Sequence, residues 1–400
     1  MTMKGRVLLV GIVMLAEMWL VGCGHYNCGA TFGASSCSAG NGGLNQGNGN
    51  TPAGTFVYIA DAGGIQGEVV DPTTKQISTI PGGTANVNTN VPGDWMVTAQ
   101  QKYLYSGYQS MGEIYGWSVS GSGTLTAITG MGPLIASYLI NNTSAGAQAI
   151  VTNPAGTLLF ALDQGTDQIN AYQIGTSGAL ASPTITQLPA GFMPGNLAID
   201  GQGKFLYVSN LVGLSTTEVA VYSINSTSGA LTPQGNPAAL NLMQMEGESS
   251  GKFMIGTSGG LFGSIGGNLY VASIDQSTGA LTATLASATG QPIDVVVQPN
   301  ASGTLVYTVD APTSGLNGQV EGFTLNLSTG TLTAIQGVSV TATGFMGEFD
   351  LSGKYLYVSS NPSEAHIGLN VYDVSADTTL AAPLAGVAWS QGAWVPFDTP

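Results

Sequence analysis

The chain has 400 residues, of which 59 are glycine, and a formal net charge of −15 at pH 7. Charged residues make up 7% and hydrophobic residues 43%, so the chain has enough apolar material to form a packed core. The acidic balance argues against nucleic acid as a partner, because phosphate binding needs basic patches. The many glycine, threonine, serine and valine residues are typical of an all-β protein with tight turns.

Residues 1–22 have the features of an export signal. Two basic residues, Lys4 and Arg6, precede a short apolar run over residues 7–20, as in secretory signals. The run ends in Leu20-Val21-Gly22-Cys23, which resembles the bacterial lipobox, whose cysteine is lipidated and becomes the mature N-terminus. We therefore expect a lipid anchor on Cys23 and a location in the cell envelope. A cleaved signal without lipid and a retained anchor helix are the alternatives.

Residues 23–53 are predicted to form a flexible tether. Ser38 to Gly54 is rich in glycine and asparagine and has no apolar period, which is typical of a linker. Cys28 and Cys37 could form a disulfide, because exported chains reside where disulfides persist, or they could stay free.

The remaining residues, 54–400, repeat a pattern at intervals of about 50 residues, as repeat architectures do. A short apolar strand with an aromatic residue recurs seven times, starting at Thr55, Lys102, Thr157, Lys204, Lys252, Thr304 and Lys354. An apolar strand precedes most copies, and an alternating strand, a polar turn and a Leu-Thr strand follow each one. Four strands per repeat predict an all-β, seven-bladed propeller of four-stranded antiparallel blades. A solenoid of stacked repeats is the alternative.

The first repeat lacks its own leading strand, and the end of the chain offers a replacement. Trp394-Val395-Pro396-Phe397 aligns with Asn196-Leu197-Ala198-Ile199, the leading strand of a later repeat. We predict that this last segment joins the first blade and closes the ring, because closure removes the open strand edges that invite aggregation.

The segment Lys204-Phe205-Leu206-Tyr207-Val208-Ser209-Asn210, followed by Ser228-Gly229-Ala230-Leu231-Thr232, resembles the lactonase-type seven-bladed propellers, which include a form of 6-phosphogluconolactonase. Through its repeats the resemblance covers residues 54–400, and it implies hydrolysis of a lactone. Family members that act on anionic lactones place histidine and arginine in the central funnel. After residue 22 this chain has no arginine, and its only histidine beyond the tether is His366. An anionic sugar phosphate would therefore meet no arginine clamp.

The repeat register predicts a polar, acidic top face. All five lysines of the mature chain are predicted to lie at turns of the opposite, bottom face. The ends of the second strands and the starts of the first strands should share the top face, the latter nearer the central channel. The candidates for ligand binding there are Asp61, Tyr108, Asp163, Asn196, Asn210 and Asp310. The alternative is plain turn chemistry, since aspartate, asparagine and serine end strands by bonding nearby backbone N–H groups.

A cation site and a catalytic base are further hypotheses. Asp94 and Asp294, at the starts of two first strands, could hold calcium together with carbonyl oxygens of the channel, because hard cations take several oxygen ligands. His366, two residues after Glu364, could serve as a general base, although a histidine in a loop is more often simply solvated. Asp94 and Asp294 are the other catalytic candidates.

Three functions are consistent with these features of the sequence. The first is a monomeric, lipid-anchored propeller that binds a glycan, a cation or another envelope protein without the histidine and arginine set of the family. The second is a lactonase, a carboxylic ester hydrolase, that uses acidic funnel residues with a metal-activated water. The third is a structural spacer without a ligand.

Overall fold

The structure is a computed structural model that describes the propeller body apart from several loops. It describes residues 55–61, 64–71, 77–86, 95–108, 113–129, 147–163, 166–192, 194–212, 216–258, 267–286, 290–299, 305–310, 318–342, 347–350, 352–359, 367–374, 386–389 and 394–397. The residues of the predicted export signal and tether, with Cys23, Cys28 and Cys37, lie outside these ranges, as do Lys75, Asp94 and His366. Within the ranges, no helix has the length and apolar character to cross a membrane.

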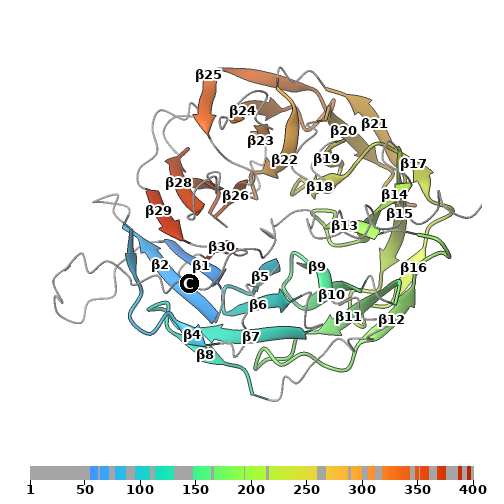
Figure 1. Ribbon diagram of the computed structural model, residues 1–400. Coiled ribbons are helices and arrows are strands. Elements are labelled where there is room, and N and C mark those ends of the chain that lie inside the picture. Colours follow the sequence, from blue (N-terminus) through green and yellow to red (C-terminus); the bar gives the residue numbers. More distant parts are fainter. Residues whose placement is uncertain are drawn as a thin grey trace, which may run out of the picture.

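The described strands form seven antiparallel sheets arranged in a ring (Figure 1). Blade 1 contains β1 (Thr55–Asp61), β2 (Gly64–Val70), β3 (Ile77–Thr79), β4 (Ala85–Asn86) and β30 (Trp394–Phe397). Blade 2 contains β5 (Trp95–Ala99), β6 (Tyr103–Tyr108), β7 (Glu113–Val119) and β8 (Leu125–Ala127). Blade 3 contains β9 (Ala147–Thr152), β10 (Leu158–Asp163), β11 (Gln168–Gln173) and β12 (Thr184–Gln187).

The other four blades repeat this order. Blade 4 contains β13 (Pro194–Ile199), β14 (Phe205–Val212), β15 (Thr216–Ile224), β16 (Leu231–Pro233) and β17 (Ala238–Ala239). Blade 5 contains β18 (Gln244–Gly247), β19 (Phe253–Thr257), β20 (Leu269–Ile274) and β21 (Leu281–Leu285). Blade 6 contains β22 (Pro292–Val297), β23 (Leu305–Asp310), β24 (Gly318–Leu325) and β25 (Leu332–Ala342). Blade 7 contains β26 (Gly347–Phe349), β27 (Tyr355–Ser359), β28 (Ile367–Asp373) and β29 (Gly386–Trp389).

The ring is closed by the two ends of the described chain, as the sequence predicts. Strand β30 pairs antiparallel with β1, with Phe397 opposite Phe56 and Trp394 opposite Ile59. It supplies blade 1 with the innermost strand that every other blade takes from its own repeat. The predicted all-β, seven-bladed fold with a closing C-terminal strand is therefore confirmed.

The hydrophobic core lies in layers between neighbouring blades. The second strands β6, β10 and β23 are buried along their whole length, because each has a blade on both faces, so they read as apolar runs rather than alternating strands. One cluster joins side chains of blades 1 and 2, such as Phe56 and Trp117, and another joins those of blades 6 and 7, such as Tyr307 and Phe349. Burial between blades thus explains why the second strand, with its aromatic residue, is the pattern that recurs most clearly in the sequence.

The aromatic residue of the second strand also connects blades through its hydroxyl group. Its partner is the carbonyl oxygen of a hairpin glycine in the next blade. The bonds are Tyr58 to Gly123 at 2.7 Å, Tyr105 to Gly178 at 2.6 Å and Tyr207 to Gly279 at 3.0 Å. These glycines have φ between +72° and +80°, a conformation that favours glycine. Blades 3 and 5 carry Phe160 and Ile255 at the same register position, which offer no hydroxyl group.

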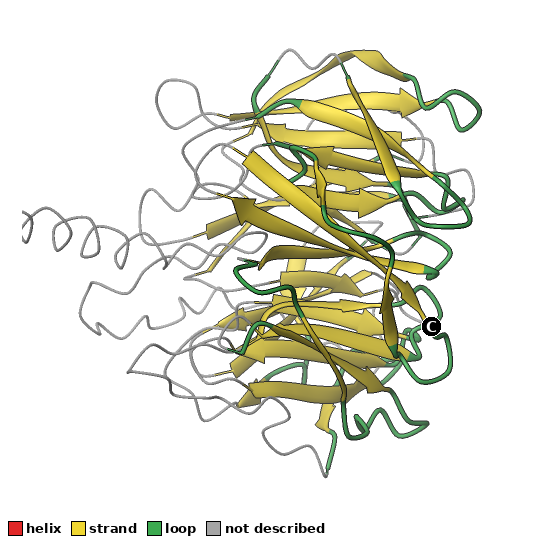
Figure 2. Cartoon of the chain, turned by 90° about the vertical axis from the view of Figure 1, so that its right-hand side faces the viewer, coloured by secondary structure: helices red, strands yellow, loops and turns green. Residues whose placement is uncertain are grey.

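The turns between first and second strands gather on one side of the ring, where Figure 2 shows the described turns on the right. In four blades a polar side chain closes this turn. In blade 4, Asp200 Oδ1 accepts from the backbone N–H groups of Lys204 at 2.7 Å and Phe205 at 2.6 Å. Asn153, Glu248 and Asp350 do the same in blades 3, 5 and 7. Four lysines occupy these turns, namely Lys102, Lys204, Lys252 and Lys354.

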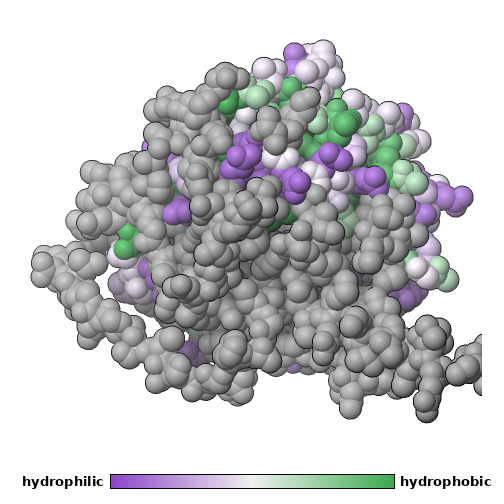
Figure 3. Space-filling model, turned by 45° about the horizontal axis from the view of Figure 1, so that its top comes forward, coloured by the Kyte–Doolittle hydropathy of each residue, from purple (hydrophilic) through white to green (hydrophobic). Residues whose placement is uncertain are grey.

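Figure 3 shows part of the described outer surface. Hydrophilic and hydrophobic residues are interspersed over the part visible in Figure 3. Among the described residues, the exposed large hydrophobic side chains are Ile185 and Leu285, on the outermost strands of blades 3 and 5.

Candidate functional site

A cavity of about 810 Å³ runs along the innermost strands in the centre of the ring. Its described lining comes from blades 2 to 7, and it extends from Asn196, Gln244 and Asp294 at the starts of three strands to turn residues such as Pro154 and Pro299. A central channel of this size is within the range of small-molecule sites.

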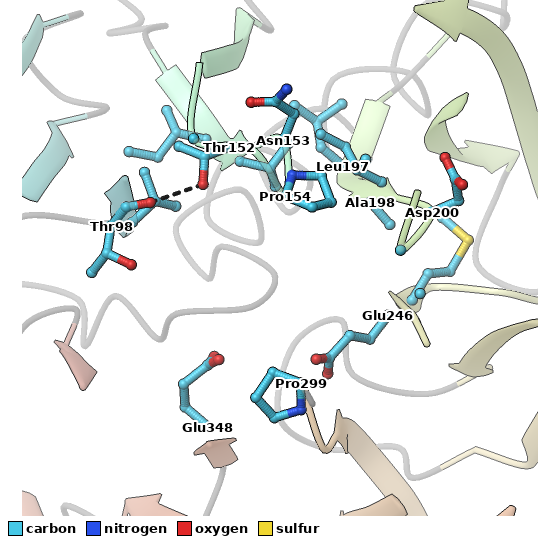
Figure 4. A pocket seen from close by; sticks show the side chains of 18 of the residues that line it. Thr98, Thr152, Asn153, Pro154, Leu197, Ala198, Asp200, Glu246, Pro299 and Glu348 are labelled. Carbon is cyan, nitrogen blue, oxygen red and sulfur yellow. Dashed lines mark hydrogen bonds between the residues drawn. The ribbon is translucent and has the colours of Figure 1, made fainter. Parts of the chain in front are cut away.

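Three carboxylates project from successive blades into this channel: Glu246 of β18, Asp294 of β22 and Glu348 of β26. Glu246 Oε2 accepts the backbone N–H of Val297 at 3.0 Å, and Asp294 Oδ2 accepts that of Gly347 at 2.9 Å. Each of these bonds joins one blade to the next. Figure 4 shows the side chains of Glu246 and Glu348 directed into the open space.

The three carboxylates hold protons far more tightly than exposed ones. Burial raises the pKa of Asp294 to about 7, against hydrogen bonds from the Gly347 and Val295 backbone that lower it. Burial and then the charge of Asp294 raise the pKa of Glu348 to about 8. Burial and then the charge of Glu348 raise the pKa of Glu246 well above its usual value, although the hydrogen bond from the Val297 N–H lowers it in part. The cluster therefore changes its charge near neutral pH.

Neutral polar groups complete the described lining. Asn196 Nδ2 donates to Gln244 Oε1 at 2.5 Å, and both side chains are buried. Elsewhere in the lining, the Thr152 hydroxyl donates to the carbonyl oxygen of Thr98 at 2.9 Å (Figure 4). The described lining residues include no lysine, arginine or histidine. The described lining therefore offers carboxyl, amide and hydroxyl groups, and it offers an anionic group no cationic partner.

The structure brings two of the sequence candidates, Asn196 and Asp294, into this channel. Four others lie elsewhere and are almost completely buried, namely Tyr108 at 0%, Asp163 at 0%, Asn210 at 4% and Asp310 at 1% exposure. Asp61 is the last residue of β1. Asp94 and His366 lie outside the described residues, so the Asp94–Asp294 calcium site and a base at His366 stay predictions. In the described ranges no group of three or more histidine, cysteine, aspartate or glutamate side chains is arranged to hold a metal ion.

The buried candidates have local partners at the ends of their strands. Asp163 Oδ1 accepts the backbone N–H of Thr166 at 3.3 Å, which is the turn chemistry considered as the alternative. Asn210 Nδ2 donates to Glu218 Oε2 at 3.1 Å across the β14–β15 pair. Burial and then the charge of Glu321 raise the pKa of Asp310 to about 7.

Glu246 and Glu348 are the functional candidates that the sequence analysis missed. They stand two residues after Gln244 and Met346, which the repeat register places at the starts of first strands. Residues i and i+2 of a strand share a face. Extending the search by two residues along each first strand would therefore have found both glutamates.

The comparisons with known proteins agree with this architecture. Residues 51–245, just under half of the chain, match the protein-family model described as "Lactonase, 7-bladed beta-propeller". No curated protein matches the sequence. The fold and this match together define a lactonase-like seven-bladed β-propeller.

Solved structures show the same fold at low sequence identity. The periplasmic gluconolactonase of Pseudomonas aeruginosa superposes with a TM-score of 0.59 and 15% identity, covering 86% of this chain and 99% of that one. A provisionally assigned 6-phosphogluconolactonase of Bacteroides uniformis gives 0.58 and 14%, with 84% and 99% covered. A protein of unknown function from Desulfotomaculum acetoxidans gives 0.59 and 13%, with 86% and 99% covered. At these identities the likeness concerns the fold alone.

Proposed function

We propose that this protein is a monomeric, lipid-anchored binding module of a bacterial cell envelope, and that its central channel takes a neutral, polyhydroxylated ligand such as a glycan. The observation that carries the proposal is the described channel lining, which presents Glu246, Asp294 and Glu348 with the Asn196–Gln244 amide pair and no basic side chain. Carboxylates accept hydrogen bonds from sugar hydroxyls, and amides both donate hydrogen bonds to these hydroxyls and accept them. Where these carboxylates are ionised they repel a phosphorylated or carboxylated ligand, and no basic side chain among the described lining residues would attract one.

The anchor and the location rest on the signature of residues 1–23 in the sequence. Mass spectrometry of the N-terminal peptide from the membrane fraction tests them. We expect a diacylated or triacylated peptide that starts at Cys23, and a soluble, secreted chain after the substitution C23A. An unmodified N-terminus before residue 23 in the membrane fraction would contradict the lipid anchor.

Hydrolysis of a neutral lactone is the second candidate, and the environment of Asp294 favours it. A carboxylate with a pKa of about 7 is suited to accept a proton from water near neutral pH. Water activated in this way would attack the lactone carbonyl carbon, the ring C–O bond would break, and the leaving alkoxide would take a proton to give the hydroxy acid. Phosphorylated lactones are disfavoured by the charge of the channel.

One set of measurements separates the two candidates. Calorimetric titration of the purified protein with neutral oligosaccharides should show binding that E246Q and E348Q weaken at least tenfold. The matched substitution E218Q, on the third strand of blade 4 and outside the channel, should leave the affinity unchanged. A pH-stat assay should show no turnover of neutral lactones. Turnover that D294N abolishes would instead identify a lactonase, and neither binding nor turnover would refute both proposals.

A further inference from the structure

The turn between β5 and β6 of blade 2 has a strained backbone, and it lines one end of the channel. Lys102 N donates to the carbonyl oxygen of Ala99 at 3.0 Å, which closes the turn. Its two central residues, Gln100 and Gln101, have φ of +53° and +51°. Consecutive left-handed residues are typical of type I′ turns, in which glycine, asparagine and aspartate dominate. The Cβ atom of glutamine opposes this conformation.

The equivalent turns of other blades avoid this strain. In blades 3, 4, 5 and 7 the turn between the first and second strands has one left-handed residue, which is always a glycine. These glycines are Gly156, Gly203, Gly251 and Gly353, with φ between +63° and +71°. Among the described residues, Asp167 is the other non-glycine residue with positive φ, and aspartate tolerates this region better than glutamine does. Blade 2 therefore keeps two long side chains where glycine would be favoured.

The next blade holds this turn in place through Gln100. Its Nε2 donates to the carbonyl oxygen of Gly156 at 3.0 Å. A Cβ atom at Gly156 would lie 2.6 Å from Gln100 N and 3.0 Å from Gln100 Cγ, so the two turns are packed closely. Gln100 therefore joins blades 2 and 3. The side chain of Gln101, in contrast, forms no hydrogen bond within the described part of the chain.

Gln101 offers the channel an amide group at this end. It is exposed and belongs to the channel lining. Asn153 and Asp200 line the same end, but both are buried, and the side-chain oxygen of each accepts backbone N–H groups of its own turn. The amide of Gln101 can therefore both donate to a ligand hydroxyl and accept from it.

The separation between Gln101 and the channel carboxylates bears on the size of the ligand. Val97 of β5 has the register position of Glu246 in β18 and of Glu348 in β26. Gln101 follows Val97 by four residues. At about 3.3 Å per strand residue, and with the turn folding back, it lies roughly 10 Å further along the strand direction. A ligand that contacts both levels is longer than one sugar ring.

We propose that Gln101 is a binding residue of the channel, and that the ligand is a neutral oligosaccharide that reaches from the carboxylates of blades 5 to 7 to this amide. The inference rests on the proposed glycan-binding function, to which it adds a second contact region and a minimum ligand length. Gln100 is a positioning residue, because its bond to Gly156 fixes the turn that carries Gln101. Glycine at position 101 would remove the strain, but it would also remove the amide.

Calorimetric titration of the full chain with N-acetylglucosamine and with its β-1,4-linked hexamer tests the proposal. The wild-type protein should bind the hexamer at least tenfold more tightly than the monomer. Q101G should weaken hexamer binding about fivefold, as expected for one lost hydrogen bond, and leave monomer binding unchanged. Its melting temperature should stay the same or rise, because relief of the strain offsets the greater freedom of glycine in the unfolded chain.

Gln202 provides a matched control. It lies in the corresponding turn of blade 4 and is not among the described lining residues of the channel. Its Nε2 donates to the carbonyl oxygen of Ser249 at 2.8 Å. Q202A should therefore lower the melting temperature and leave hexamer affinity unchanged, which is the opposite of the result expected for Q101G.

Three results would contradict the proposal. Hexamer binding that E246Q and E348Q weaken but Q101G leaves unchanged would refute the contact with Gln101, while the proposed function would stand. Equal wild-type affinities for monomer and hexamer would refute the ligand length. Absence of wild-type binding to either sugar and to other neutral oligosaccharides would refute the proposed function and this inference with it.

Discussion

Replacing Asp294 by asparagine should make the propeller more stable at pH 8, because this carboxylate is ionised there at a cost. Burial raises its pKa from 3.8 to about 7, and each pKa unit corresponds to about 1.4 kcal/mol. The full shift of roughly three units would give about 4 kcal/mol. Because the residue lines a water-accessible channel beside Glu246 and Glu348, we expect about half of this, or about 2 kcal/mol. The amide oxygen of asparagine can still accept the Gly347 N–H.

The sign of the pH dependence follows from the raised pKa. Below about pH 4 both the folded and the unfolded carboxyl are protonated, so Asp294 and asparagine are equivalent in charge. Between about pH 4 and pH 7 the folded chain keeps the proton that the unfolded chain has lost, and the stability of the wild-type protein falls as the pH rises. The advantage of D294N should therefore grow across this window and stay constant above it.

Equilibrium unfolding in urea, followed by tryptophan fluorescence at pH 4, 6 and 8, measures this difference. Asp275 gives a control of opposite sign, since hydrogen bonds from Ser277 and Thr278 hold its pKa below the usual value. Its stabilisation is present above the unfolded pKa and is lost in acid, so D275N should reduce stability at pH 8. An equal loss of stability in D294N at pH 4 and pH 8 would refute the reasoning for Asp294.

Three further outcomes concern the ring itself. G178A should lower the free energy of unfolding, measured in urea titrations, by about 1–3 kcal/mol more than G235A does. Both glycines have φ near +80°, but a Cβ at position 178 would lie 2.5 Å from Tyr103 Cδ1 while one at 235 meets nothing within 4 Å. Y207F should cost about 1 kcal/mol through the lost bond to the next blade, and an unchanged midpoint would show that this bond is dispensable. Truncation before Trp394 should lower the melting temperature sharply, and an unaltered melt would contradict closure by β30.

The seven blades could be predicted from the sequence because packing between neighbouring blades requires the same pattern of apolar residues in every repeat. Each second strand lies between two neighbouring blades, so it must be apolar along its length, and an aromatic side chain fills the layer. The replacement strand at the chain end was visible for the same reason, since Trp394 to Phe397 had to match the inner strands of other repeats.

The sites were harder to predict because they depend on details that differ between blades. The ring predicted on the top face contained Asp163, Asn210 and Asp310, which the structure buries beside their partners on the third strands. Sequence alone does not give the register of that pairing. It also could not show that Glu246 and Glu348 converge from blades whose residues lie far apart along the chain.

The pairing of β30 with β1 also bears on how the chain assembles. It joins positions 56 and 397, so it is among the contacts with the greatest sequence separation in the fold, and such contacts form slowly. Until β30 arrives, the inner edge of β1 is bare, and the β30 of a neighbouring copy satisfies it equally well. Refolding at high protein concentration should therefore yield strand-exchanged dimers, whereas dilution should favour the closed monomer.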